Sequence, residues 1–431
     1  MAYRQLSEGS VTAYLAGLPE MQGRFSSFDD LDVHEVGDGN LNYVYIVTNR
    51  TRPDETVAVK QSVPFLRIVG ESWPLSRHRM DFEIAALKRQ AELCPEHVPE
   101  VYFASSDMSL VVMRNLRDHR ILRGEMIKGK RFPLLADHMS TFLARTLFFT
   151  SDLSLAHNEK KEAVRNSINI ELCKITEDFV FTHPYDDSDT NDYNPELPRA
   201  AIDGIQKDPA VRAAVGEMKY AFMTGAEALI HGDLHIGSIM GNESETYVID
   251  PEFAFYGPMG FDIGALIGNL YLAYFAQEWR QRDLGNDPDP YRRWLLETAD
   301  AVWSGFEQKF LQLWRSSDAG RGVSFIGRDI DGDRGGKAFR ESFMRKLLAD
   351  SIGFAACKMM RRIVGIAKVA DIVGIPDLKA RANIEQQALE MGRRMVVRRR
   401  EFGTIADLTA LAQEISPLGA RVDGRESVRR R

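Results

Sequence analysis

Three acidic residues between positions 231 and 262 carry the chemistry that this sequence suggests most clearly. Asp233 follows a glycine at the end of an apolar run, and Asp250 and Glu252 flank Pro251 directly after a β-branched pair. One carboxylate at such a position can accept the proton of an acceptor hydroxyl, and a second, after the next strand, can hold the metal ion that bridges nucleotide phosphates. The pattern predicts phosphoryl transfer, with Asp233 in the first role and Asp250 in the second.

Each of these motifs has a plainer explanation when it is taken alone. His-Gly-Asp is a common turn, and Asp followed by Pro commonly ends a strand. Here Asp233 and Asp250 lie 17 positions apart, with a hairpin-like pattern between them and Asp262 at the start of an apolar helix. The combination is therefore more specific than either motif. We expect Asp262 to be the N-cap residue of that helix.

A glycine-rich turn and a lysine-bearing strand would supply the nucleotide site. Residues 37–40 (Gly-Asp-Gly-Asn) join two predicted strands, and Lys60 lies inside a third strand at 56–63. Glycines let backbone amides approach a polyphosphate, and protein kinases place a lysine on the phosphates after such a hairpin. Taken separately, the turn could be an ordinary hairpin and Lys60 an exposed lysine.

The segment after this strand should supply a partner for the lysine. Residues 77–93 are strongly helical, and the register set by Ile84 and Leu87 predicts that Glu83 faces Lys60. The connection before the helix is longer than such a connection needs and contains Trp73, so we expect it either to be disordered or to contact a ligand.

Two further strands, at 101–105 and 109–113, lead into a connector at Met113, Arg114 and Asn115. In a kinase-like fold this connector is the hinge, whose backbone holds the adenine edge. Side-chain identity therefore says little at these three positions.

The length and the change in periodicity predict two lobes. A chain of 431 residues is too long for one compact core, and the apolar spacing changes from two to three and four after Leu116. We expect an α+β, two-lobed protein-kinase-like fold. Residues 1–115 would form a small antiparallel-sheet lobe that binds ATP, and residues 116–431 a larger, mainly helical lobe with the catalytic loop, the metal site and the acceptor site.

The composition of the chain argues against two classes of partner, nucleic acids and membranes. The 55 basic and 62 acidic residues give a net charge of −7, which argues against a general nucleic-acid binder. No run of eighteen apolar residues occurs, and the first ten residues lack an apolar signal core. We therefore expect no membrane association and a cytoplasmic location.

With these motifs, the chain resembles the 5-methylthioribose kinases, within the group that includes aminoglycoside and choline phosphotransferases. The resemblance covers most of residues 30–400. It rests on GDGNLN at 37–42, GESWPL at 70–75, HGDLHIGS at 231–238 and DPEFAFYGPMGFDIG at 250–264. The wider group has an Asn metal ligand five residues after the catalytic Asp, where this chain has Ser238.

The resemblance implies transfer of the ATP γ-phosphate to the 1-hydroxyl of 5-methylthioribose, a step of methionine salvage, with Mg²⁺ and typically in a homodimer. The residues implied to contact ATP are Asn40, Lys60, Met113, Arg114, Asn115, Asp250, Pro251 and Glu252. Those implied to meet the substrate are Asp233, Trp73, Arg361 and Arg362. Asp250 would bind the metal together with Glu252, which replaces the missing Asn, while Glu83 and Asp262 would support the site.

Several alternatives stay open. Arg361 and Arg362 could instead be a helix-end or surface pair. The protein could be another small-molecule kinase of the same group, although an aminoglycoside would favour an acid-lined cleft. It could also be a non-catalytic nucleotide-binding scaffold, but a scaffold has no need of Lys60, Asp233 and Asp250 together.

Overall fold

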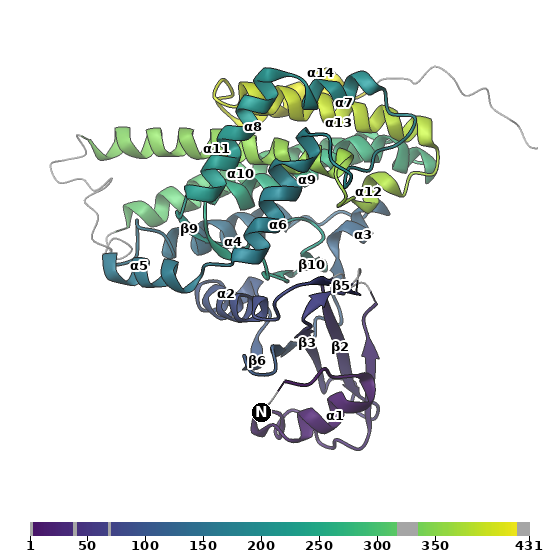
Figure 1. Cartoon of the computed structure of the whole chain (residues 1–431), viewed down its shortest axis with the longest axis vertical. Coiled ribbons are helices and arrows are strands. Elements are labelled where there is room, and N and C mark those ends of the chain that lie inside the picture. The colour runs from purple at the N-terminus through teal and green to yellow at the C-terminus, as the bar shows by residue number, and fades with distance from the viewer. Residues whose placement is uncertain (1–2, 38–40, 68–69, 317–334, 420–431) are drawn as a thin grey trace, which may run out of the picture.

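A small sheet lobe and a larger helical lobe follow one another along the longest axis of the molecule (Figure 1). The computed structural model describes residues 3–37, 41–67, 70–316 and 335–419. The α+β, two-lobed fold expected from the sequence is confirmed, with a five-stranded antiparallel sheet followed by mainly helical structure.

The sheet of the N-terminal lobe separates a core from a cavity. Its strands lie in the order β1-β2-β3-β7-β6, and each neighbouring pair is antiparallel. Tyr45, Val47, Val57 and Val59 pack on the side of α1, and the alternate residues face the cavity, as the two-residue period of strands requires. The strands are β1 (Leu31–Glu35), β2 (Asn42–Asn49), β3 (Thr56–Ser62), β6 (Val101–Ser105) and β7 (Leu110–Arg114), and α1 is Glu8–Ala16.

The sequence predicts that the connection between β3 and the next helix is disordered or contacts a ligand, and its described residues include regular structure. It contains a two-stranded hairpin of β4 (Phe65–Leu66) and β5 (Gly70–Pro74), which precedes α2 (Arg79–Leu93). Backbone pairing between β4 and β5 therefore gives the described residues of this hairpin a regular structure.

The crossing of α9 (Met259–Asp283), whose glycines recur every four residues, with α11 (Gly336–Val364) forms the centre of the helical lobe. A Cβ atom on Gly264 of α9 would lie 2.4 Å from the carbonyl oxygen of Ser351 in α11, so only a glycine permits this close approach. The length and composition of α9 would suit a membrane span, but its most apolar window is 100% buried by packing in the described structure. The close crossing fixes the C-terminal half of α11 beside the loops that follow β9 (Ala228–Ile230) and β11 (Thr246–Val248).

The helices of this lobe are α3 (Leu122–Ile127), α4 (Leu135–Phe149), α5 (His157–Asn166), α6 (Ile170–Phe181), α7 (Arg199–Gln206), α8 (Pro209–Thr224), α9 (Met259–Asp283), α10 (Asp289–Arg315), α11 (Gly336–Val364), α12 (Ala370–Val373), α13 (Leu378–Arg398) and α14 (Ile405–Ile415). Short 3₁₀ turns lie at Pro19–Met21, Pro95–His97 and His183–Tyr185.

Two small sheets hold the loops that carry the predicted acids. One pairs β9 (Ala228–Ile230) with β12 (Phe255–Gly257), and the other orders β11 (Thr246–Val248), β10 (Ile239–Gly241) and β8 (Arg120–Ile121). The loop after β9 bears Asp233, and the turn after β11 bears Asp250, so both acids reach the face that meets the N-terminal lobe.

Candidate active site

A cavity of about 550 Å³ lies between the two lobes and collects most of the predicted site residues. Its wall includes Lys60, Glu83, Met113, Arg114, Asn115, Asp233, Asp250, Glu252, Arg361 and Arg362. A second cavity, of about 580 Å³, lies between α10 and α11 and contains none of them.

Lys60 is buried between two carboxylates. Its Nζ donates to Glu83 Oε1 over 2.7 Å and also contacts Asp250 Oδ1. Burial lowers the pKa of Lys60, but Asp250 and Glu83 outweigh it and raise the pKa above its ordinary value, so the ammonium stays charged. The expected pairing of Glu83 with Lys60 is thus present, and it fixes the ammonium group at the wall of the cavity.

The acids around Lys60 suit a divalent cation. Oxygens of Glu83, Asp250 and Glu252 lie within 4.8 Å of one another, and within the described residues the buried Oε2 of Glu83 has no hydrogen-bond partner. Burial and then Asp250 raise the pKa of Glu252, a repulsion that a bound cation would relieve. Asp250 has a φ of 68°, a conformation that non-glycine residues rarely adopt away from functional sites. The residues therefore fit the expected metal.

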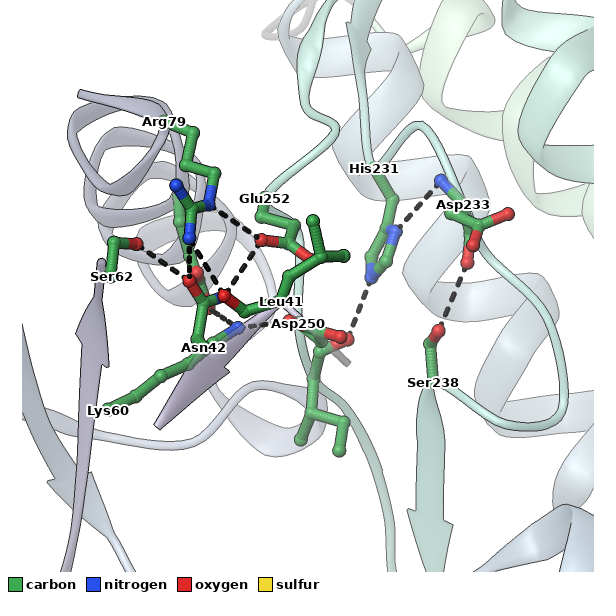
Figure 2. A network of polar contacts seen from close by, with 12 residues as sticks. Leu41, Asn42, Lys60, Ser62, Arg79, His231, Asp233, Ser238, Asp250 and Glu252 are labelled. Atoms are coloured by element: carbon green, nitrogen blue, oxygen red, sulfur yellow. Dashed lines mark hydrogen bonds and ion pairs between the residues drawn. The ribbon is translucent and has the colours of Figure 1, made fainter. Parts of the chain in front are cut away.

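Glu252 also joins the two lobes, as Figure 2 shows. Its Oε2 accepts a hydrogen bond of 2.8 Å from Asn42 Nδ2 and lies 3.6 Å from Arg79 Nε. Asn42 Oδ1 in turn accepts from Ser62 and Arg79 at 2.8 Å each. Glu252 is therefore anchored as well as placed in the acidic cluster.

Asp262 holds the backbone of the loop that carries Asp233. The amides of His231 and Gly232 donate to Asp262 Oδ2 and Oδ1 over 2.6 and 3.0 Å. Gly232 has a φ of 84°, and a Cβ there would lie 2.2 Å from the carbonyl oxygen of Phe253. The bracing role expected of Asp262 is present. The expected N-cap role is wrong, because Pro258 caps α9 and the helix begins at Met259.

Ser238 stabilises the loop that carries Asp233 through hydrogen bonds within that loop. Its hydroxyl donates to the carbonyl oxygen of Asp233 over 3.1 Å and lies 3.1 Å from His235 Nδ1 (Figure 2 shows the first contact). His231 Nε2 donates to the carbonyl oxygen of Ile249 over 2.8 Å, which joins the two acid-bearing loops. In this structure the Ser238 hydroxyl is thus engaged within the loop that carries Asp233.

Asp233 faces three cations of α11. Its Oδ1 lies 2.7 Å from Lys358 Nζ and 3.6 and 3.9 Å from the Nη2 atoms of Arg361 and Arg362. Burial raises the pKa of Asp233, but Lys358 and the other cations outweigh it and hold the pKa well below its usual range. Burial lowers the pKa of His235, whose Nε2 is 3.4 Å from Oδ2, so this neighbour is neutral. Asp233 is therefore a carboxylate across the physiological range.

Arg361 and Arg362 are not a surface pair. Each is 7% exposed, and within the described structure neither buried Nε atom has a hydrogen-bond partner. Buried guanidinium groups with unused N–H donors can bind an anion that enters the cavity.

Three of the predicted contacts are not seen at the cavity wall. Asn40 lies outside the described residues. Pro251 does not line the cavity. Trp73 does not line it either and packs against Phe179, with the two ring centroids 6.2 Å apart. Phe179 does line the cavity, so Trp73 supports the wall from behind.

Sequence reasoning missed Lys358, His235, Asn42 and Arg79. A signal for Lys358 exists, since it precedes Arg361 and Arg362 by three and four positions and therefore shares their helix face. Asn42 and Arg79 had no such signal, because their contacts with Glu252 span the two lobes.

Comparisons with known proteins agree with this geometry. Residues 32–294 match the model of the phosphotransferase enzyme family (APH). The chain is 42% identical over 415 residues to methylthioribose kinase 1 of Oryza sativa subsp. japonica, covering 95% of each chain. It is 39% identical over 396 residues to a methylthioribose kinase of Bacillus cereus, covering 92% of this chain and 93% of that one.

Among solved structures, a choline kinase from Cryptosporidium parvum Iowa II aligns with a TM-score of 0.45 at 11% identity, over 96% of this chain and 98% of that one. The full-length similarity to curated relatives is what decides the assignment. The chain belongs to the phosphotransferase enzyme family and, within it, to the methylthioribose kinases.

Proposed function

We propose that this protein transfers the γ-phosphoryl group of ATP to the 1-hydroxyl of 5-methylthioribose, giving 5-methylthioribose 1-phosphate and ADP, in methionine salvage. The observation that carries the proposal is the full-length similarity to methylthioribose kinases, in a chain whose Asp233, Lys60 and Asp250 line one cavity.

The acceptor end of the cavity suits a neutral sugar with an apolar substituent. Beside Asp233 it carries Lys358, Arg361 and Arg362, whose charges would repel the ammonium groups of an aminoglycoside. The neighbouring wall is apolar and would accept a methylthio group. Its residues are Ile175, Phe179, Val180, Ile366 and Ala367.

The reaction assigns a separate task to each charged group. The 1-oxygen attacks the γ-phosphorus, the bond between that phosphorus and the bridging oxygen breaks, and ADP leaves. Asp233 orients the hydroxyl and accepts its proton as the new bond forms. Arg361 and Arg362 stabilise the charge on the equatorial oxygens, and Lys60 holds the phosphates of the donor.

Magnesium, a homodimeric assembly and a cytoplasmic location belong to the same proposal. Asp250 and Glu252 would hold the metal, which when bound neutralises phosphate charge. The adenine would lie against the hinge at Met113 to Asn115, where the sheet supplies apolar side chains such as Val44 and Ile46.

A panel of acceptors tests the proposal. Purified protein with Mg-ATP is assayed for ADP release with methylthioribose, ribose, choline and an aminoglycoside. We expect kcat/KM for methylthioribose to exceed the others by roughly a hundredfold or more. A preference for an amino alcohol or an aminoglycoside would assign a different kinase activity. ATP binding without turnover of any acceptor would favour the scaffold.

A further inference from the structure

Lys358 is a buried charge to which the proposed reaction assigns no task. It lies one turn before Arg361 in α11, is 3% exposed, and its Nζ is 4.4 Å from the centroid of the Phe261 ring. A lysine is rarely buried without a partner, and here the partner is Asp233.

The contacts of Asp233 divide between its two oxygens. Oδ1 is 2.7 Å from Lys358 Nζ, a hydrogen-bond distance, whereas both arginines lie at 3.6 Å or more. Oδ2 has the looser neighbour, His235 Nε2 at 3.4 Å. Lys358 therefore fixes the rotation of the carboxylate through one oxygen, and the other oxygen is left for an incoming hydroxyl.

We propose that Lys358 is a positioning residue, whose ammonium holds Oδ1 of Asp233 so that Oδ2 meets the acceptor hydroxyl. The inference rests on the proposed function, in which Asp233 receives the proton of that hydroxyl. The proposal also gives the three cations of α11 different roles. Lys358 neutralises Asp233, and the two arginines then remain available to bind the phosphoryl group.

Lys358 differs from these arginines in one respect that an experiment can use. Burial lowers the pKa of Lys358, Asp233 raises it, and Arg361 and Arg362 lower it again, with a net value of about 8. An arginine keeps its charge at any pH that a protein survives. The charged and titratable groups around Lys358 are Asp233 and His235 in the catalytic loop, Asp262 in α9, and Arg361 and Arg362 in its own helix.

The sign of the pH effect follows from this environment. Above about pH 8 Lys358 loses its proton, Oδ1 loses the positive charge of its hydrogen-bond donor, and kcat/KM should fall. Lys358→Arg keeps a cation at this position, so the alkaline limb should move to higher pH by about one unit or more. Lys358→Met removes the donor, so kcat should fall about tenfold or more at neutral pH, with the Kd for ATP within about threefold.

The experiment measures kcat and kcat/KM for methylthioribose between about pH 6 and about pH 10 for the wild type, both Lys358 variants and Lys346→Met. Lys346 is the matched control, since it lies in the same helix, pairs with Glu227 and Asp350, and has a 63% exposed side chain. Its loss should leave kcat and the alkaline limb unchanged.

An alkaline limb that stays in place in Lys358→Arg, or a Lys358→Met variant with more than about half of the wild-type kcat, would overturn the positioning role. The wild-type profile by itself tests whether kcat/KM falls above about pH 8. The positioning role of Lys358 can therefore be judged even if one of its variants folds poorly. Failure of the wild type to phosphorylate methylthioribose at any pH would instead refute the proposed function.

Discussion

The side-chain amide of Asn42 donates a 2.8 Å hydrogen bond to the carboxylate of Glu252, across 210 positions of sequence. Asn42 opens the second strand of the sheet lobe, and Glu252 belongs to the acidic cluster of the helical lobe. This bond couples the relative position of the lobes to the geometry of the acidic cluster.

Loss of the Asn42 side chain should cost more stability than the loss of one hydrogen bond. Asn42→Ala removes the donor to Glu252 and the acceptor for Ser62 and Arg79, all of them buried. We expect the free energy of unfolding, measured by urea denaturation, to fall by about 2–4 kcal/mol. Ser62→Ala is the control and should cost about 1 kcal/mol. Equal losses in the two variants would show that the interlobe bond adds nothing.

Local patterns in the sequence predict the strands and the acid-bearing loops well. The strand expected at 101–105 is β6 as the structure has it, and the helical register placed Glu83 correctly against Lys60. Both depend on side chains that alternate or recur within one element, which a sequence displays directly.

Contacts between elements were harder to predict. The start of α9 is set by Pro258, which moves Asp262 into the first turn, and the hairpin of β4 and β5 directs Trp73 away from the cavity. The burial of Lys358 depends on the close crossing of α9 and α11. Its spacing from Arg361 and Arg362 places the three cations on one helix face, but that spacing does not show that the face is buried.

Asp250→Ala should weaken ATP binding in magnesium specifically, because it removes a charged oxygen ligand from the acidic cluster. Isothermal titration calorimetry with and without magnesium measures this. We expect the Kd for ATP to rise about tenfold or more with the metal and to change much less without it. Equal losses in both conditions would indicate a folding defect.

Arg361→Lys and Arg362→Lys should each lower kcat/KM for methylthioribose about tenfold or more, with a small change in Tm. A lysine keeps the charge but cannot present two parallel donors to a phosphoryl group. Arg393→Lys, at a part-exposed arginine of α13 that pairs with Glu390, is the control and should be neutral. If both active-site variants stay within about twofold of the wild type, the acceptor phosphate is bound elsewhere.

Asp233→Asn should lower kcat about a hundredfold or more while the Kd for ATP stays within a few-fold. The structure adds a second effect, because the change leaves Lys358 and both arginines without their counter-charge. The Tm should therefore fall as well. Retention of more than about a tenth of the wild-type kcat would remove Asp233 from the role of base.

Nuclear magnetic resonance of the sugar product shows which oxygen carries the phosphoryl group and so tests directly whether the protein phosphorylates the 1-hydroxyl of methylthioribose. The wild-type protein is incubated with methylthioribose and Mg-ATP, and the product is examined for phosphorus coupling. We predict a single phosphorylated sugar whose phosphorus couples to the anomeric proton, formed together with an equal amount of ADP. Phosphorylation at another hydroxyl, or ADP and free phosphate with an unmodified sugar, would contradict this prediction.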